Sequence, residues 1–256
     1  MKTIARTFMI SVLSCVSIVS AAQGGLGALA QSGVEGPVVV VDLVKFKPDG
    51  AAEYAIYDKI AEAKVKELGG AVIFRGVATE VSPLESDAWD RVTFRKYPTV
   101  AAVMAMGSSK EYQGAFPHRL ASVEKSFVYA FWGEMPSFVE GEKPRMHPMN
   151  VVPAPATSDT VYMLNLLRFK KDGGERKFFL EYGAPRGGHR PDPVLILKGI
   201  GAVIADEVVD RLILVSYPSG EVFREMITSA EYRAVSHLRT EAIELGLIWP
   251  FSSVAE

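Results

Sequence analysis

Along this chain, segments with the apolar pattern of a β-strand alternate with segments whose apolar residues recur at helical spacing. Residues 38–46 form a nearly continuous apolar run rich in β-branched residues, which predicts a buried strand. Asp49-Gly50 predicts a turn, and residues 51–68 then carry apolar side chains at helical spacing until Gly69-Gly70 ends the pattern. The remaining expected elements of this half are strands at 71–78, 90–97 and 126–132 and helices at 100–106 and 109–125.

The same order of patterns returns after residue 159, which indicates an internal repeat. Five segments match between the halves in the same order. They pair Asp42–Gly50 with Asn165–Gly173, Val72–Gly76 with Leu195–Gly199, Asp90–Pro98 with Asp210–Pro218, Ser109–Tyr112 with Ser229–Tyr232, and Arg119 with Arg239. Each half therefore has the element order β-α-β-β-α-β, the split βαβ arrangement of ferredoxin-like domains.

Both faces of the predicted strands are apolar, as residues 38–46 show. Helices can cover only one face of such a four-stranded sheet, so the other face needs a second cover. The tethered second half offers the matching surface at high effective concentration. The sequence thus predicts an α+β fold with two ferredoxin-like repeats packed sheet to sheet, a pseudo-twofold dimeric α/β-barrel in one chain.

Segments of unusual composition divide the chain. Residues 136–158 contain five prolines and few periodic apolar residues, which predicts a linker or surface strap. Residues 23–36 are rich in Gly, Ala, Ser and Gln and predict a mobile leader. The repeats are then expected at residues 37–135 and 159–256.

The first 22 residues have the pattern of a secretory signal peptide. A basic start, an apolar run of residues 8–19 and small residues up to Ala22 predict cleavage near Ala22 and a periplasmic or secreted protein; an uncleaved anchor is the main alternative. Cleavage would remove Cys15, the sole cysteine, and reduce the 28 basic residues to 26 against 30 acidic ones, a formal charge of −4. That balance argues against a nucleic-acid partner.

A family resemblance rests on several short strings. Tyr162–Phe169, Glu181–Gly183, Asp210-Arg211 before a strand ending in Tyr217-Pro218, Ser229–Tyr232 and His237–Arg239 together resemble the family called domain of unknown function 1330. The resemblance covers most of the second half and, more weakly, most of the first. It implies the dimeric α/β-barrel superfamily and its barrel-type pairing. It implies no reaction, because enzymes of that superfamily differ widely in their chemistry.

The second half departs from this pattern between residues 183 and 193, where three prolines and three glycines exclude a long helix. We expect the preceding helix to end near Tyr182. The segment carries His189 between two arginines, so it could form a lid that contacts an anionic ligand, or an ordinary surface insertion.

Polar residues inside the apolar strands are candidates for ligand binding. Asp42 and Asn165 occupy equivalent positions, and each could orient a ligand carbonyl or hydroxyl group or make a structural hydrogen bond. Arg168 lies near a strand end, where a surface role is the simpler interpretation. Lys198 is a candidate for stabilising an anion.

The predicted last helix supplies the other candidates. His237 could transfer a proton, or it could be an exposed histidine bonded to a carboxylate. Arg239 could bind an acidic ligand or pair with a nearby glutamate. The hydroxyl groups of Tyr182 and Tyr232 could face a pocket, although their rings suit the core. We therefore predict His237, Asn165 and Arg239 as catalytic and Asp42, Arg168, Tyr182, Lys198, Tyr232 and His189 as substrate-binding.

No metal, nucleotide or nucleophile-elbow motif occurs in the sequence, and its four histidines are scattered. These features favour an exported enzyme without a bound metal that acts on a small oxygenated or aromatic compound by isomerase, cyclase, lyase or monooxygenase chemistry. The alternative is a non-catalytic periplasmic module that binds a small ligand or haem. We expect no other cofactor and no membrane contact after cleavage, and a homodimer is possible.

Overall fold

The computed structural model describes residues 25–84, 88–183 and 193–254. The predicted signal peptide, its Cys15 and His189 lie outside the described residues. None of the described helices is both long and apolar enough to cross a membrane.

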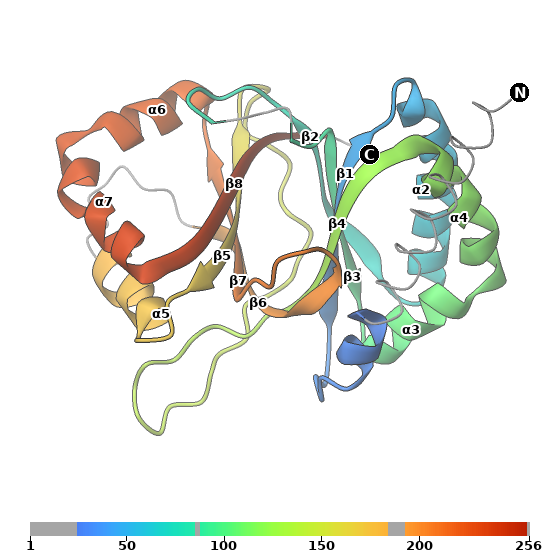
Figure 1. Ribbon diagram of the computed structural model, residues 1–256, viewed down its shortest axis with the longest axis horizontal. Coiled ribbons are helices and arrows are strands. Elements are labelled where there is room, and N and C mark those ends of the chain that lie inside the picture. The colour runs from blue at the N-terminus through green and yellow to red at the C-terminus, as the bar shows by residue number, and fades with distance from the viewer. Residues whose placement is uncertain (1–24, 85–87, 184–192, 255–256) are drawn as a thin grey trace, which may run out of the picture.

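The two halves repeat one order of elements (Figure 1). The elements of the first half are β1 (Val38–Phe46), α2 (Gly50–Glu67), β2 (Ala71–Ala78), β3 (Arg91–Tyr97), α3 (Val100–Ser108), α4 (Lys110–Ser122) and β4 (Val123–Trp132). Those of the second half are β5 (Val161–Phe169), α5 (Gly174–Lys177), a π-helical turn (Phe178–Tyr182), β6 (Pro193–Ile204), β7 (Arg211–Tyr217), α6 (Gly220–Thr228), α7 (Ala230–Ala242) and β8 (Ile243–Ser253).

The strands form one closed barrel in the order β1-β3-β2-β8-β5-β7-β6-β4. Each half contributes four antiparallel strands, and two pairings between the halves close the barrel. Strand β2 pairs with β8, placing Gly76 opposite Ser253, and β4 pairs with β6, placing Trp132 opposite Lys198. The predicted fold is confirmed, because the helices cover the outside of each half and the halves share the interior (Figure 1).

Strand alternation explains why both faces are apolar. Val39, Val41 and Leu43 of β1 belong to the barrel core, a cluster to which both halves contribute. Val38 and Val44 point the other way and pack under the helices of the first half with Tyr54. Side chains of a strand point alternately to its two faces, so burying both requires a continuous apolar run.

The helix after the first strand differs strongly between the halves. In the first half α2 has 18 residues, whereas α5 has four and continues only through the five-residue π-helical turn to Tyr182. This end agrees with the expectation from the prolines and glycines that follow. Among the described residues, the second half therefore has nine helical residues where the first half has an 18-residue helix over its sheet.

Two segments expected to be mobile or on the surface are packed instead. Residues 25–30 are helical, and Leu29 is only 2% exposed in the cluster beneath the first-half helices, so a mobile leader is wrong for this part. In the proline-rich strap, Met149 and Val152 join the barrel core, and the Val152 amide donates to the Ile73 carbonyl at 2.8 Å. Other strap residues, including Val139 and Val151, are exposed as expected.

Candidate functional site

A cavity of about 410 Å³ lies between the sheet of the first half and its helices α3 and α4, with Tyr57 of α2 in its wall. We call it the first-half cavity. It is lined by Leu26, Val40, Asp42, Tyr57, Arg95, Tyr97, Val103, Met106, Gly107, Tyr112, Gln113, Phe116, Arg119, Val128, Val203 and Ile204. Its walls are mainly apolar and aromatic, with a small polar group at one place, which is the usual composition of a small-molecule site. Val203 and Ile204 come from β6, so the second half completes this cavity.

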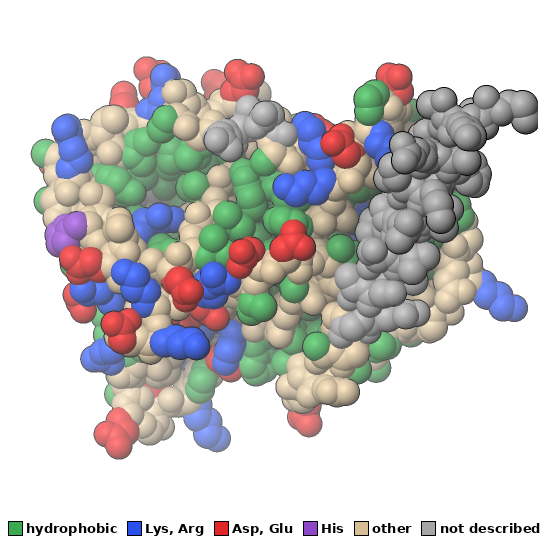
Figure 2. Space-filling model, viewed as in Figure 1, with side chains coloured by type: hydrophobic (Ala, Val, Ile, Leu, Met, Phe, Trp, Pro, Cys, Tyr) green, Lys and Arg blue, Asp and Glu red, His purple; other side chains and the backbone are tan. Residues whose placement is uncertain are grey.

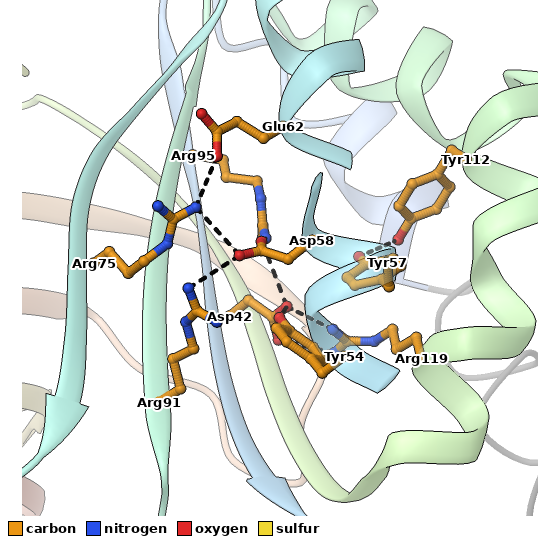
Figure 3. Close-up of polar contacts among 10 residues, drawn as sticks. All are labelled: Asp42, Tyr54, Tyr57, Asp58, Glu62, Arg75, Arg91, Arg95, Tyr112 and Arg119. Atoms are coloured by element: carbon orange, nitrogen blue, oxygen red, sulfur yellow. Dashed lines mark hydrogen bonds and ion pairs between the residues drawn. The ribbon is translucent and has the colours of Figure 1, made fainter. Parts of the chain in front are cut away.

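The polar group forms because three elements present charged side chains to the same buried space (Figure 3). Asp42 lies on β1 and Arg95 on β3, on the sheet face that the helices cover. Arg119 reaches in from α4, near the end of that helix. Each of these side chains is buried.

Asp42 is held by three donors. Arg119 donates to both carboxylate oxygens, Nη1 to Oδ2 at 2.6 Å and Nη2 to Oδ1 at 2.8 Å. The Tyr54 hydroxyl donates to Oδ2 at 3.2 Å, and Arg95 Nη1 lies 3.5 Å from the same oxygen. Such a paired and hydrogen-bonded carboxylate can remain ionised although it is buried.

A second buried carboxylate, Asp58 of α2, continues this network. It accepts from Arg95, and both Arg75 and Arg91 lie within 3.2 Å of its Oδ2. Arg75 also pairs with Glu62 at 2.9 Å. The ten residues of Figure 3 thus contain four arginines and three carboxylates, an excess of one positive charge.

Arg95 carries a donor with no acceptor. Its side chain is 4% exposed, and its Nε has no hydrogen-bond partner among the described residues. An unpaired buried donor costs roughly 1–3 kcal/mol, so such groups call for a functional or structural reason. Because Arg95 lines the cavity, an acceptor oxygen of a ligand is a suitable partner.

The ionisation states follow from burial and neighbouring charges. Burial raises the pKa of Asp42, but Arg119 and Arg95 outweigh it and hold this pKa below the ordinary value of 3.8. Burial, and after it the charge of Asp42, raises the pKa of Tyr54 to about 12. Burial likewise raises the pKa of Tyr57 well above its ordinary value. At neutral pH, Asp42 is therefore ionised and both tyrosines remain protonated donors.

The Tyr57 hydroxyl donates to the Tyr112 hydroxyl at 3.2 Å. Both rings line the first-half cavity, so the two hydroxyls form a short donor chain at its wall. The guanidinium of Arg119 lies 5.3 Å from the centroid of the Tyr57 ring, which fixes the ring by a cation–π contact.

The equivalent cavity of the second half has a volume of about 450 Å³, and we call it the second-half cavity. It brings together four of the predicted residues, which are Asn165, Tyr182, Tyr232 and Arg239. The Asn165 amide nitrogen donates to the carbonyls of Met163 at 3.2 Å and Ile213 at 3.3 Å. In Figure 2, hydrophobic side chains surround a hollow in the second half below α6.

The structure does not place His237 in this cavity. His237 and Arg239 are two residues apart on α7, which separates them by about 200° around the helix axis. Arg239 lines the cavity, and His237 is exposed on the other side. Tyr232, seven residues before Arg239, lies on the same helix face as Arg239.

Two further predicted residues form ion pairs near the barrel end instead. Arg168 lies 2.7 Å from Glu207 and 3.6 Å from Glu244. Lys198 pairs with Glu134 and lies over the Trp132 ring. Neither lines the first-half or the second-half cavity. Their long side chains follow the surface, as the simpler interpretation of Arg168 expected.

Sequence reasoning missed the Asp58 network and the role of Arg95. A signal was present in both elements. Asp58 falls on the apolar face of α2, one position after Tyr57, where a solvent-facing carboxylate is not expected. Arg91 and Arg95 alternate with apolar residues on β3, and their charge is opposite to that of Asp58.

Comparison with known proteins agrees with this geometry. Residues 43–130 match the family model described as Domain of unknown function (DUF1330). The chain belongs to this family. The match falls on the first half, whereas the strings that suggested the family came mostly from the second. The first half has the 18-residue helix α2, whereas the helix α5 at the equivalent place in the second half has four residues.

Three solved structures are similar to the chain. A protein of unknown function from Rhodopseudomonas palustris is 32% identical over 41% of this chain and 89% of that one, with a TM-score of 0.36. An anthrone oxidase-like protein is 10% identical over 88% and 93% of the two chains, with a TM-score of 0.58. Chlorite dismutase from Candidatus Nitrospira defluvii, in complex with imidazole, is 10% identical over 88% and 94%, with a TM-score of 0.54.

The last two likenesses show the fold, a dimeric α/β-barrel, which here is built within one chain. A search of curated proteins found no match.

The described residues do not fit a haem site. A histidine is a common axial ligand of haem iron, yet His118, His147 and His237 all lie outside the walls of both cavities. His118 Nδ1 is 2.6 Å from a Glu53 oxygen, and His147 lies in the strap. The described part of the chain also holds no cluster of three or more His, Cys, Asp or Glu residues suited to a metal ion.

Proposed function

We propose that this protein is an exported small-molecule enzyme without a resident metal, which binds an oxygenated aromatic compound in the first-half cavity as its oxyanion. The observation that carries the proposal is Arg95, a buried arginine that lines an apolar cavity and whose Nε has no acceptor among the described residues. An enolate or phenolate oxygen would accept from it. Electrostatic stabilisation of developing charge is commonly the largest single contribution to catalysis.

The surrounding charges favour the same ligand state. The network has one more arginine than carboxylates, so a bound anion would balance it. The Tyr57 hydroxyl remains a donor at neutral pH, because burial raises the pKa of Tyr57, and it donates to the Tyr112 hydroxyl. The aromatic rings of these residues and Phe116 suit a flat ligand body. A structural relative named anthrone oxidase-like is in keeping with this class of compound.

In this proposal, the arginines and Asp42 have different roles. Arg95 and Arg119 hold the negative charge on oxygen, and Asp42 fixes Arg119 in place by its two hydrogen bonds. Asp42 is a weak base, because its pKa lies below the ordinary value. The site therefore acts by lowering the pKa of the ligand hydroxyl rather than by a strong general base.

A chromophoric phenol tests the proposal. We expect 4-nitrophenol bound to the protein to ionise at a pKa lower by one unit or more, which corresponds to about 1.4 kcal/mol, measured by its visible absorbance across a pH series. Met106→Trp fills the first-half cavity and should abolish the shift, whereas Met226→Trp at the equivalent second-half position should retain it. Circular dichroism checks the fold of both variants. An unchanged or raised pKa in the complex would refute the proposal.

The alternative is a non-catalytic binding module. It is favoured by one observation, that the pKa values of Asp42, Tyr54 and Tyr57 all lie away from neutral pH. A panel of hydroxylated aromatic compounds under air separates the two functions. Consumption of the compound or of oxygen that Met106→Trp abolishes supports the enzyme, and recovery of every bound compound unchanged supports the module.

Export is the remaining part of the proposal. Sequencing the N-terminus of the protein from a periplasmic fraction should find a chain that begins near Gln23. A cytoplasmic chain that begins with Met1 would contradict export. A homodimer also stays a prediction, because the barrel is already closed within one chain.

A further inference from the structure

The second-half cavity differs from the first in its charge. Its described lining consists of apolar and aromatic side chains, Asn165 and a single charged residue, Arg239. Arg95 of the first half corresponds to Val215, so the described part of this wall has no counterpart of that buried arginine. The volume of about 450 Å³ lies within the range of roughly 300–1,000 Å³ that small-molecule sites occupy.

Arg239 has lost the partner that its counterpart keeps. In the first half, Asp42 binds Arg119 through both carboxylate oxygens. At the position of Asp42 the second half has Asn165, whose amide nitrogen is used by the carbonyls of Met163 and Ile213. No salt bridge joins Arg239 to a carboxylate among the described residues.

The guanidinium of Arg239 lies close to the backbone of β8 at Gly246. Its two terminal nitrogens lie 3.3 and 3.6 Å from the point that a Cβ atom on Gly246 would occupy, so this glycine of β8 leaves room for the group. The side chain is partly buried, and it lies on the cavity wall with Tyr232 of the same helix. A cation held in such an environment attracts an anion more strongly than an exposed one does.

We propose that the second-half cavity binds a monocarboxylate with an apolar, preferably aromatic body, and that the carboxylate replaces the missing aspartate opposite Arg239. A guanidinium offers two parallel donors that match the two oxygens of a carboxylate. The described lining holds one cation, Arg239, which balances one negative charge and favours a monoanion over a phosphate ester. Phe178, Phe179 and Phe223 would contact the ligand body.

This inference goes beyond the proposed function, because it concerns a different cavity and different residues. It predicts that the duplicated halves bind different ligands. The first half would stabilise an oxyanion within a network that already contains carboxylates. The second half would use the ligand itself as the counterion.

Calorimetry with 2-naphthoate and its neutral analogue 2-naphthamide tests the inference. We expect the wild-type protein to bind naphthoate at least tenfold more tightly than the amide. Asn165→Asp restores the internal pair and should remove this preference, and Arg239→Met should do the same. In both variants the affinity for the amide should change less than threefold, which separates a lost charge contact from a lost cavity.

Two tryptophan variants assign the site. Met226→Trp fills the second-half cavity and should remove naphthoate binding, whereas Met106→Trp should leave its affinity within about twofold. This pattern is the reverse of that expected for 4-nitrophenol, so the two proposals fail separately. Melting curves establish that the variants are folded, and Asn165→Asp, which changes no volume, serves if Arg239→Met does not fold.

Three results would overturn the inference. They are equal affinities for naphthoate and naphthamide, an unchanged preference in folded Asn165→Asp, and loss of naphthoate binding in Met106→Trp rather than in Met226→Trp. If naphthoate does not bind, decanoate and decanamide are compared in the same way. Failure of both carboxylates to bind more tightly than their amides also overturns it.

Discussion

Asp42 and Asn165 occupy equivalent places in two related strands, one with a carboxylate and the other with a carboxamide. This difference gives the two cavities different charges. Asp42 is buried and holds Arg119, which is also buried. Removing one member of a buried ion pair leaves the other charge uncompensated, which typically costs about 3–5 kcal/mol. Asn165 has no such charge to lose, so the second half tolerates the amide.

We predict that Asp42→Asn destabilises the protein by about 3–5 kcal/mol at neutral pH, measured by urea unfolding. The pKa of Asp42 lies below its ordinary value in the folded protein. Its stabilising effect is therefore complete above the unfolded pKa of about 3.9 and disappears as the pH falls through the folded pKa. The difference between variant and wild type should accordingly shrink below about pH 4.

Asp49→Asn is the matched control, because Asp49 is exposed and has a positive φ of 60°, a conformation that asparagine tolerates. Its unfolding free energy should stay within about 0.5 kcal/mol of wild type. If Asp42→Asn were as stable as Asp49→Asn, the buried pair would have no structural importance.

At the scale of elements, the repeat conserves the junction between the first strand and its helix. Gly50 begins α2 and Gly174 begins α5, although these helices have very different lengths. An added Cβ would lie 2.3 Å from the Ser122 carbonyl oxygen at Gly50 and 2.2 Å from the Ala242 oxygen at Gly174. The last turn of the neighbouring helix passes so close that only glycine fits.

We predict that Gly50→Ala destabilises the protein by about 1–3 kcal/mol, because backbone atoms must shift to relieve the contact. Gly114→Ala is the control in the opposite direction. Nothing lies within 4 Å of an added Cβ at Gly114, and the residue is inside α4, so alanine should stabilise by about 0.5–1 kcal/mol. The midpoints of urea unfolding measure both effects. If Gly50→Ala had the stability of the wild type, α2 and α4 could move apart without cost, which would contradict the prediction.

At the scale of the molecule, the halves depend on each other for more than a shared core. Val203 and Ile204 of the second half line the first-half cavity, and Leu84 of the first half lines the second-half cavity. The pairings of β2 with β8 and of β4 with β6 leave no free edge in the barrel. Each half alone would expose two strand edges and an apolar sheet face.

We therefore predict that a chain cut in the exposed strap between Glu140 and Gly141 keeps its two parts together. When both parts are produced in one cell, an affinity tag on one should recover the other in equal amount, and size-exclusion chromatography should show a single 1:1 complex. Each part produced alone should aggregate. Two folded monomers that do not associate on mixing would contradict the interdependence of the halves.

The pattern of residues was enough to predict the repeat, the element order and the barrel, because strand and helix periods and turn residues are local properties. The double-faced apolar run at Val38–Phe46 also indicated that a second layer had to cover the sheet. The break after Tyr182 followed from proline and glycine chemistry alone. These features depend on neighbouring residues, which a single sequence displays directly.

Only the tertiary structure decided which side chains share a cavity. The direction of a side chain on a helix changes by about 100° per residue, so one position separates a lining residue from an exposed one, as Arg239 and His237 show. The partners of Asp58 come from two strands far along the chain, and no local pattern pairs them. The sequence determined the framework through local periodicity, and the site arose from long-range packing that brought distant charges into one buried space.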